Sequence, residues 1–297
     1  MGYGSYTSAD WSKLRDSAGI SEKSTASQIF KKLGMEEKFN PKFVNMREAM
    51  DSEDHPNSTP IIIGLDVTGS MGYLSEEIAK NSLHETMMKL YSTKPVDDPQ
   101  LLFAAIGDVS DRAPLQVTQF ESDIRIAEQL LDLWLEGRGG DSPEDFELLW
   151  YFAAKHTKID SYEKRGKKGF LFTIGDADCH PEVRGADIAN IFGDDPERFT
   201  SRKLAEMAGE KYEIFHIDLS GNFTKPFHFN GTIPGKIITL SKQDVSAIPE
   251  VIITVMQMVN GMSLEDAVAQ WSSYAQPIVR NAVEGLVLKT KKKGFFF

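Results

Sequence analysis

The chain has 297 residues, 41% of them hydrophobic and 26% charged, which is an ordinary balance for a protein that folds around an apolar core. Its formal net charge of −11 argues against a general nucleic-acid binder, whose affinity depends on neutralising phosphates. No apolar run is long enough to span a membrane, and the single cysteine, Cys179, excludes an internal disulfide. Residues 1–6 lack the basic and apolar regions of a signal peptide, so we expect a reducing compartment, the cytoplasm.

Residues 1–59 are predicted to be an N-terminal extension. Apolar residues at helical spacing within it predict a helix over 21–33, which ends at Gly34. The polar run 51–60 contains two prolines and predicts a loop that leads into the next unit.

Residues 60–260 alternate between apolar strand patterns and helical patterns. This alternation is typical of the α/β class, with a doubly wound, mostly parallel central sheet and helices on both faces. The strand at 115–120 can return on its predecessor as a hairpin. Strands are predicted at 61–65, 101–106, 115–120, 169–174, 213–219 and 236–240, and helices at 74–90, 123–135, 143–156 and 245–259.

Residues 261–297 are predicted to form a C-terminal helix and a tail. Ser263 is placed to cap the helix, which runs toward Leu288 and is expected to bend near Pro277. The tail, residues 289–297, consists mainly of lysine and phenylalanine. It is either a solvated chain end or a docking peptide for a partner or a membrane surface.

An oxygen-rich loop follows the first predicted strand of the central unit. The strand ends in Leu65, and Asp66, Thr68 and Ser70 then occupy alternate positions before a helix begins near Tyr73. Open α/β sheets bind ligands where a strand runs into such a loop, and oxygen ligands of this kind suit Mg²⁺, Mn²⁺ or Ca²⁺. The alternative is that Thr68 and Ser70 only cap the helix.

Two later segments carry further oxygen ligands at the ends of predicted elements. Gly139 and Gly140 let the backbone approach a ligand closely, and Asp141 follows them at the start of a predicted helix. Asp176 ends a predicted buried strand, as Asp66 does. Two such carboxylates at the same edge of a parallel sheet repel each other unless a cation lies between them. The sequence therefore predicts a metal site formed by three loops.

These three loops resemble the metal-ion-dependent adhesion site (MIDAS) of the von Willebrand factor A (vWA) domain family. The first loop of that family reads Asp-x-Ser/Thr-x-Ser, which Asp66, Thr68 and Ser70 match. The third loop of the family supplies an Asp at a strand end, and Asp176 matches it. The second loop supplies a Thr after a pair of glycines, and in this chain Asp141 stands in its place.

The departure at Asp141 resembles one branch of the family, the A domains that accompany atypical alpha-kinases. Those have a Gly-Gly-Asp-x-Pro-Glu-Asp second loop and an Ile-x-Asp-Ala-x-x-His third loop, which this chain matches at 139–145 and 174–180. The resemblance covers residues 60–260, and the residues after it are too few for a kinase domain. A further carboxylate at the site predicts either tight metal binding or an Asp141 that reaches the metal through water. It also makes an acidic ligand from a partner less suitable.

The family resemblance implies a metal-dependent protein–protein interaction module without catalytic activity. A side chain of a partner protein would complete the coordination of the cation. Intracellular members of the family work as scaffolds, some beside AAA+ ATPases, so the partner implied is such an ATPase or an assembly complex. The implied cofactor is Mg²⁺, with Mn²⁺ or Ca²⁺ as alternatives, and the implied ligands are Asp66, Thr68, Ser70, Asp141 and Asp176.

Two other functions stay open. Asp66 and Asp176 also resemble the acidic residues of Mg²⁺-dependent phosphohydrolases of the haloacid-dehalogenase type, with Lys167 or Lys168 as the lysine that these enzymes need. Those enzymes carry a second Asp two residues after the nucleophile, where this chain has Thr68. The other alternative is a structural or assembly protein with a non-functional metal site, whose contacts come from the N-terminal extension and the C-terminal helix.

Two smaller groups of polar residues lie near the three loops. Asp108 and Asp111 follow a predicted strand on the same side of the sheet, and they form either a simple turn or an outer layer around the metal. Asp178, Cys179 and His180 are adjacent in the chain, and one Cys with one His is weak evidence for a zinc site.

Overall fold

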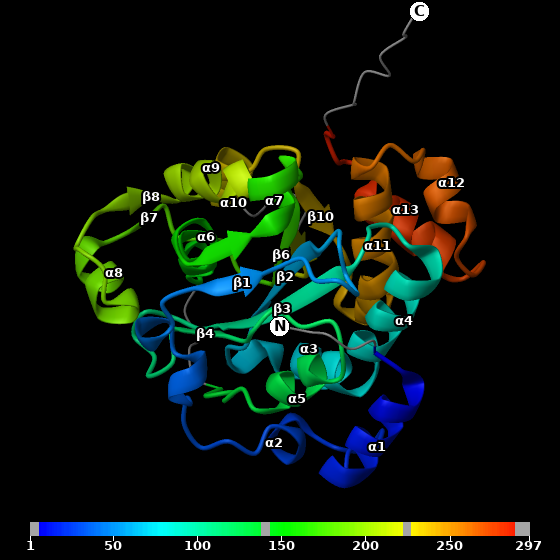
Figure 1. Ribbon diagram of the computed structural model, residues 1–297, viewed down its shortest axis with the longest axis horizontal. Helices are drawn as coiled ribbons and strands as arrows, with labels where there is room; N and C mark the ends of the chain where they lie inside the picture. The colour runs from blue at the N-terminus through cyan, green and yellow to red at the C-terminus, as the bar shows by residue number, and fades with distance from the viewer. Residues whose placement is uncertain (1–5, 138–142, 222–226, 289–297) are drawn as a thin grey trace, which may run out of the picture.

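The computed structural model describes residues 6–137, 143–221 and 227–288, and a six-stranded sheet lies at its centre (Figure 1). The strand order across this sheet is β10-β9-β6-β2-β3-β4. Counted along the chain, this is the order 3-2-1-4-5-6 of a doubly wound sheet. The strands are β2 (Thr59–Asp66), β3 (Pro99–Ile106), β4 (Leu115–Val117), β6 (Gly169–Gly175), β9 (Tyr212–Asp218) and β10 (Ile237–Thr239).

Neighbouring strands of the sheet are parallel except at one edge. There β4 pairs antiparallel with β3, with Val117 opposite Ala104, which confirms the predicted hairpin. Strand β2 lies in the middle, between β3 and β6. Its β-branched residues Ile61, Ile62 and Ile63 suit a strand that is buried on both faces.

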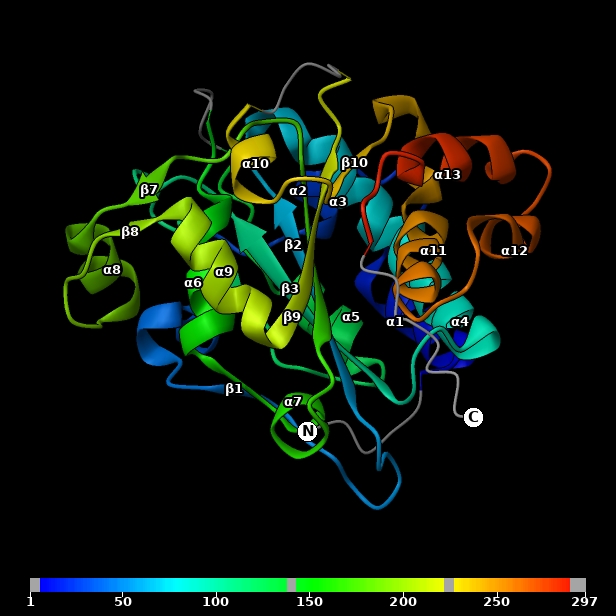
Figure 2. The same cartoon turned by 90° about the horizontal axis from the view of Figure 1, so that it is seen from above.

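Helices cover both faces of the sheet (Figures 1 and 2). One face carries α3 (Gly72–Glu77), α4 (Leu83–Thr93), α5 (Arg125–Leu131) and α11 (Ile248–Val259), and the other carries α6 (Phe146–Lys155), α8 (Gly185–Phe192) and α9 (Ser201–Lys211). Ile61 and Ile63 belong to the first of these two cores, and Ile62 belongs to the second. The predicted α/β class, with a mostly parallel sheet between two helical layers, is confirmed.

Helix α6 packs directly against β2 at Gly64. A Cβ atom at this position would lie 2.3 Å from Leu149 Cδ2 of α6 and 2.8 Å from Ile106 Cδ1. Only glycine permits so close an approach, so Gly64, two residues before the end of β2, lets α6 pack closely on the sheet. This packing brings the start of α6 close to Asp66, the last residue of β2.

Residues before β2 pack on the same body. They include α1 (Ser8–Ala18), α2 (Ala26–Ile29) and β1 (Arg47–Ala49), which pairs with β5 (Thr157–Ile159). The helix predicted over 21–33 is wrong in its extent: α2 begins at the capping box of Thr25 and Gln28, and the chain turns extended at Phe30. The sequence analysis also missed α1. The division of the chain at 59 and 260 stays a prediction.

The C-terminal segment forms two short helices rather than one bent helix. These are α12 (Leu264–Ala269), which Ser263 caps as predicted by accepting a bond from Asp266 N at 3.1 Å, and α13 (Ala275–Val283). The bend predicted near Pro277 is wrong, because the proline lies in the first turn of α13, where it needs no N–H partner. The tail 289–297 lies outside the described residues.

Further short elements are α7 (Asp160–Arg165), α10 (Phe227–Thr232), β7 (Glu182–Val183) and β8 (Phe199–Thr200). A π-helical turn, Ile78–Ser82, joins α3 to α4, so the helix predicted over 74–90 is continuous but not α-helical throughout. Among the helices of the described ranges, none has the length and apolar character that crossing a membrane requires.

Candidate metal centre

The carboxyl ends of β2, β6 and β9 lie side by side at one edge of the sheet, toward the top of Figure 2. Asp66 is the last residue of β2, Asp176 follows β6 directly, and Asp218 is the last residue of β9. Asp218 lies opposite Gly175 in the register of β6 and β9. The order of the strands reverses between β2 and β6, and doubly wound sheets bind their ligands at this reversal.

Asp66 is fully buried at this edge. Its Oδ1 accepts hydrogen bonds from the Thr68 backbone N–H at 2.9 Å and from the Thr68 hydroxyl at 2.7 Å. Its Oδ2 is buried and has no hydrogen-bond partner among the described residues. Burial raises the pKa of the Asp66 carboxyl to about 6. Hydrogen bonds from Thr68 and from the nearby Asp176 backbone N–H lower it, and the charge of Asp176 raises it.

Gly175 keeps the space beside the Asp66 carboxylate open. A Cβ atom there would lie 3.0 Å from Asp66 Oδ2 and 2.6 Å from Phe146 Cζ. A side chain at this position would therefore fill the place next to the unpartnered oxygen. Glycine is therefore required at position 175 for steric reasons, which the sequence alone did not reveal.

Glu144 is a second buried acid at this edge, and the sequence analysis gave it no role. It is 4% exposed, its carboxyl lies within hydrogen-bonding reach of Thr68, and its Oε2 has no partner in the described part of the chain. Burial raises the pKa of the Glu144 carboxyl to about 9, with the charges of Asp66 and Asp108 acting in the same direction. Its backbone N–H donates to Asp178 O at 2.8 Å, which ties the start of α6 to the third loop.

Asp218 is the third buried acid, and the sequence analysis missed it too. It is 2% exposed, and its Oδ1 accepts a bond from Ser220 N at 2.8 Å. Its Oδ2 is buried without a hydrogen-bond partner in the described ranges, and burial raises the pKa of its carboxyl. We call Asp66, Glu144, Asp176 and Asp218 together the acidic edge.

Lys242 places one positive charge against the acidic edge. Its Nζ lies 2.5 Å from Asp176 Oδ2, and it comes from the turn that precedes α11. The same ammonium lies 5.7 Å from the centre of the Tyr73 ring. Burial raises the pKa of the Tyr73 phenol to about 12, with the charges of Asp176 and Asp66 acting in the same direction, so the phenol is neutral at pH 7. Lys242 therefore balances the charge of Asp176, and a divalent cation bound there would have to displace the ammonium.

The donor set of the acidic edge fits a hard divalent cation. Every candidate ligand there is a carboxylate or hydroxyl oxygen, the type that Mg²⁺, Mn²⁺ and Ca²⁺ prefer. Of the predicted ligands, the structure brings Asp66, Thr68 and Asp176 to one edge. The side chain of Ser70 and the whole of Asp141 lie outside the described residues, so their part in metal binding stays a prediction.

The two smaller polar groups separate in the structure. Asp108 and Asp111 form a turn, in which Asp111 Oδ2 accepts a bond from Asp108 N at 3.0 Å. Asp178 uses its carboxylate to accept bonds from two backbone N–H groups at the start of α10, at 2.8 and 3.1 Å. Cys179 is fully buried, and burial raises the pKa of its thiol. His180 faces other partners, described below.

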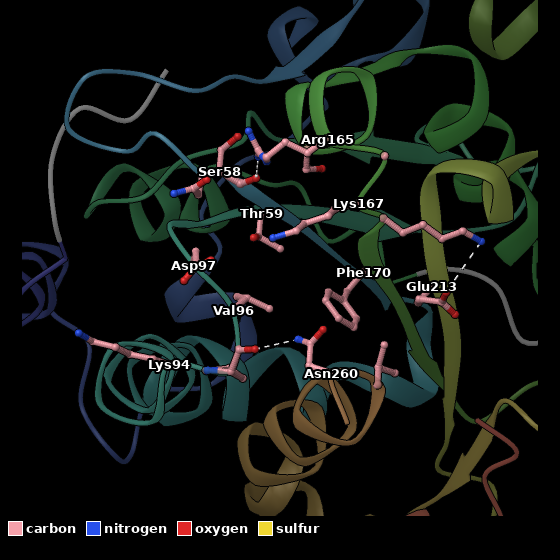
Figure 3. A pocket seen from close by; sticks show the side chains of 16 residues that line it. Ser58, Thr59, Lys94, Val96, Asp97, Arg165, Lys167, Phe170, Glu213 and Asn260 are labelled. Atoms are coloured by element: carbon pink, nitrogen blue, oxygen red, sulfur yellow. Dashed lines mark hydrogen bonds and ion pairs between the residues drawn. The ribbon is translucent and has the colours of Figure 1, made fainter. Parts of the chain in front are cut away.

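A cavity of about 480 Å³ lies at the opposite edge of the sheet, where the parallel strands begin (Figure 3). Thr59 and Phe170, at the starts of β2 and β6, line it, and Lys167 points into it. The neighbouring Lys168 donates to Gly209 O and lies 3.8 Å from Glu213 Oε1. Strand β6 separates these lysines from Asp176 by roughly 20 Å, the length of a seven-residue strand.

No protein-family model and no curated protein matches the chain. Similar solved structures include the pilus adhesin SpaC from Lactobacillus rhamnosus GG, which is 7% identical with a TM-score of 0.45 over 73% of this chain and 31% of that one. A von Willebrand factor type A protein from Catenulispora acidiphila is 13% identical with a TM-score of 0.41 over 68% and 42% of the two chains.

Proximal thread matrix protein 1 from the mussel byssus, in a form with a zinc-occupied MIDAS motif, is also similar. It is 12% identical with a TM-score of 0.45 over 67% of this chain and 48% of that one. The chain thus spans less than half the length of each of these three structures. The finer resemblance, to A domains that accompany alpha-kinases, stays a prediction.

Proposed function

We propose that the chain is a metal-dependent protein-interaction module without catalytic activity, which holds a divalent cation at the acidic edge. One observation carries this proposal: Asp66 Oδ2, Glu144 Oε2 and Asp218 Oδ2 are all buried and lack a hydrogen-bond partner among the described residues. Buried polar atoms nearly always have partners, and buried carboxylates without them cost several kcal/mol. A cation beside Asp66 and Asp176 would provide the missing interaction for Asp66 Oδ2.

Asp66, Thr68 and Asp176 are the described residues that we expect to hold the cation, together with Ser70 and Asp141 from the sequence. Mg²⁺ is the proposed ion, and Mn²⁺ or Ca²⁺ would fit the same oxygen ligands. When bound, the cation supplies a coordination position that an oxygen atom of a partner can occupy. The protein's own residues orient the ligands: the Thr68 hydroxyl and backbone N–H fix Asp66 Oδ1 and leave Oδ2 directed at the open place beside Gly175.

The charge of the acidic edge bears on the partner. Four carboxylates lie along this edge, and Lys242 pairs with one of them. A divalent cation leaves this edge negative when the carboxylates are ionised, so a partner that offers a neutral oxygen from a basic surface suits it better than one that offers an Asp or Glu. The family resemblance adds an AAA+ ATPase or an assembly complex as the proposed partner. The cytoplasm is the proposed location, on the basis of the single, buried thiol of Cys179.

The positions of Lys167 and Lys168 weigh against the phosphohydrolase alternative. A catalytic lysine must reach the same phosphate as the nucleophile, but these lysines lie at the other edge of the sheet from Asp66. Thr68, in the place of the required acid, uses its hydroxyl to donate to Asp66 Oδ1. No observation favours the alternative of a structural protein with a non-functional metal site.

The proposal is tested by affinity capture with the full chain immobilised, in Mg²⁺ and in EDTA. Wild type is compared with Asp66→Ala and with the control Asp16→Ala, which removes an exposed carboxylate on α1. We expect one set of partner proteins to bind wild type and the control in Mg²⁺, and to be lost with EDTA or Asp66→Ala. Partners that bind equally in EDTA would contradict the metal-dependent role.

A turnover assay with a generic phosphate ester separates the enzyme alternative. We expect the same background rate for wild type and for Asp66→Ala. A rate that depends on Mg²⁺ and disappears in Asp66→Ala would instead support the phosphohydrolase.

A further inference from the structure

A second group of metal-ligand side chains lies next to the acidic edge. Asp108 follows β3, Asp145 precedes α6, and His180 is the last residue of the third loop. One ligand atom from each comes within 4.8 Å of the other two. Glu144 and Asp145 are consecutive, yet Glu144 lies at Thr68 while Asp145 lies at His180, so α6 begins between two separate clusters.

Backbone groups hold the two carboxylates of this cluster in place. Val109 N donates to Asp145 Oδ2 at 2.7 Å, and Ser110 N donates to Asp108 Oδ1 at 2.7 Å. The other oxygen of Asp145, Oδ1, lies 4.0 Å from His180 Nε2. That nitrogen is buried and has no hydrogen-bond partner within the described residues, although it is 4.0 Å from a carboxylate.

Glu147 is a further buried acid beside this cluster. It lies in the first turn of α6 and is 0% exposed. Burial raises the pKa of its carboxyl well above the ordinary value, with the charge of Asp145 acting in the same direction, and the Glu147 carboxyl lies within hydrogen-bonding reach of Asp145 and of the His180 backbone. A cation bound to Asp145 would offset the repulsion between these two buried acids.

We propose that Asp108, Asp145 and His180 form a second divalent-cation site, distinct from the acidic edge and suited to Zn²⁺ or Mn²⁺ rather than Mg²⁺. The imidazole decides this preference, because nitrogen ligands suit transition ions while Mg²⁺ prefers oxygen alone. The geometry allows the site: two atoms that each bind one ion at about 2.1 Å can be at most about 4.2 Å apart. The 4.0 Å pair satisfies this limit, and the remaining contacts need to close by less than an ångström.

The site explains why His180 lies where it does. A histidine nitrogen that binds a metal needs no hydrogen-bond partner, and its ring needs an orienting contact. His180 of the third loop lies near Asp145 at the start of α6, and the 2.8 Å bond from Glu144 N to Asp178 O holds these two segments together. The cation would therefore join β3, α6 and the third loop below the acidic edge.

The test is a calorimetric titration of metal-stripped full-length protein with Zn²⁺ and with Mg²⁺, in an Asp66→Ala background that removes binding at the acidic edge. We expect one remaining Zn²⁺ site, with affinity at least about 100-fold lower after His180→Gln or Asp108→Asn. His55→Gln, a change of the same type in a loop before β2, should leave the affinity unchanged. The circular dichroism spectrum and melting temperature check that every variant is folded.

Cobalt provides a readout that a purely structural role of His180 would not change. Co²⁺ bound through the imidazole gives visible absorption bands, which His180→Gln should remove and His55→Gln should retain. The proposal is overturned if Asp66→Ala alone abolishes all Zn²⁺ binding, or if His180→Gln leaves the stoichiometry and the cobalt spectrum unchanged. In that case His180 and Asp145 are only a long ion pair.

Discussion

The two edges of the central sheet differ in how their acidic side chains are partnered. At the edge where the parallel strands begin, Arg165 Nη1 lies 2.5 Å from Asp51 Oδ2. Arg165 Nη2 donates to Ser58 O at 2.8 Å (Figure 3). Although burial raises the pKa of Asp51, the hydrogen bonds and charge of Arg165, with the bonds from Ser58, hold it below its ordinary value. At the acidic edge, burial raises the pKa of Asp66 to about 6 and of Glu144 to about 9.

This difference distinguishes an acid that stabilises the fold, Asp51, from acids that are candidates for binding a ligand, Asp66 and Glu144. Asp51 is ionised and paired, so its contribution to stability is complete within the chain itself. Asp66 and Glu144 keep buried oxygens that no described residue contacts by a hydrogen bond. The cavity, where the charges are paired, is thus a weaker functional candidate than the edge where Asp66 and Glu144 keep these buried oxygens.

The largest expected effect is on cation affinity. Asp66→Ala should lower the affinity for Mn²⁺ and Mg²⁺ at the acidic edge by at least about 100-fold, because a central ligand is removed. Equilibrium dialysis of the metal-stripped protein measures this change. Asp51→Ala is the matched control at the opposite edge, and it should leave the affinity unchanged.

The second prediction concerns stability gained from the cation. At a Mg²⁺ concentration of about 100 times the dissociation constant, the free energy of unfolding should rise by about 2.7 kcal/mol, since only the folded chain forms the site. Thermal melts with and without Mg²⁺ measure it. Asp66→Ala should melt at the same temperature in both, and a Mg²⁺-dependent shift that persists in this variant would place the cation elsewhere.

The third prediction concerns the stability that is lost when the ion pair between Asp51 and Arg165 is removed. Asp51→Ala should lower the free energy of unfolding by about 2 kcal/mol, because Arg165 keeps a charge that is 20% exposed and loses its acidic partner. Urea denaturation measures this loss in EDTA. Asp66→Ala under the same conditions should lower the free energy of unfolding by less, since it removes an acid whose Oδ2 has no hydrogen-bond partner among the described residues. An equal loss for both variants would mean that the two acids contribute equally to the stability of the fold.

The fourth prediction is a pH dependence of cation binding. A proton and the cation compete for a carboxylate, so a raised pKa means that affinity increases with pH. Glu144 lies beside Thr68 and its pKa is about 9, so its negative charge, which favours a nearby cation, is lost as the pH falls. Affinity should therefore fall by up to about tenfold from about pH 8 to about pH 7, and more steeply below about pH 6, where Asp66 also takes up a proton. Glu144→Gln should flatten the dependence above pH 7. If the slope is retained in Glu144→Gln, another group controls it.

The smallest expected effect comes from Lys242. Its ammonium bonds Asp176 Oδ2 and must turn away when a cation binds there. Lys242→Met should therefore raise cation affinity by about fivefold, about 1 kcal/mol, which corresponds to one partly exposed ion pair. Lys168→Met at the opposite edge is the control, and calorimetry should find its affinity equal to that of wild type.

Local pattern predicted the framework of the site but not all of its members. The strand that leads to Asp66 was readable because a run of β-branched residues precedes an Asp at a loop. Asp218 has the same signal, an apolar run that ends in Asp, and was overlooked because no family pattern pointed to it. The short helices α1 and α2 were predicted less well: α1 was missed and α2 is shorter than expected. Such short elements depend on caps and on packing against the rest of the protein.

Contacts between distant segments could not be read from the sequence. Glu144 meets Thr68 only because α6 packs on Gly64, and this approach depends on the three-dimensional fit of a leucine side chain. His180 was grouped with its neighbour Cys179, whereas its partners Asp108 and Asp145 come from two other loops. Nearness along the chain was a poor guide there, because the sheet brings strand ends together whatever their separation in sequence.

Anomalous diffraction from crystals grown with Mn²⁺ would show whether Asp66, Thr68 and Asp176 hold a divalent cation. We predict a peak bounded by the Asp66 and Asp176 carboxylates and the Thr68 hydroxyl, with the Lys242 ammonium moved away from Asp176. This holds whether or not the second site at His180 is filled. Ordered Asp66 and Asp176 side chains with no anomalous peak between them, at a saturating Mn²⁺ concentration, would contradict the account.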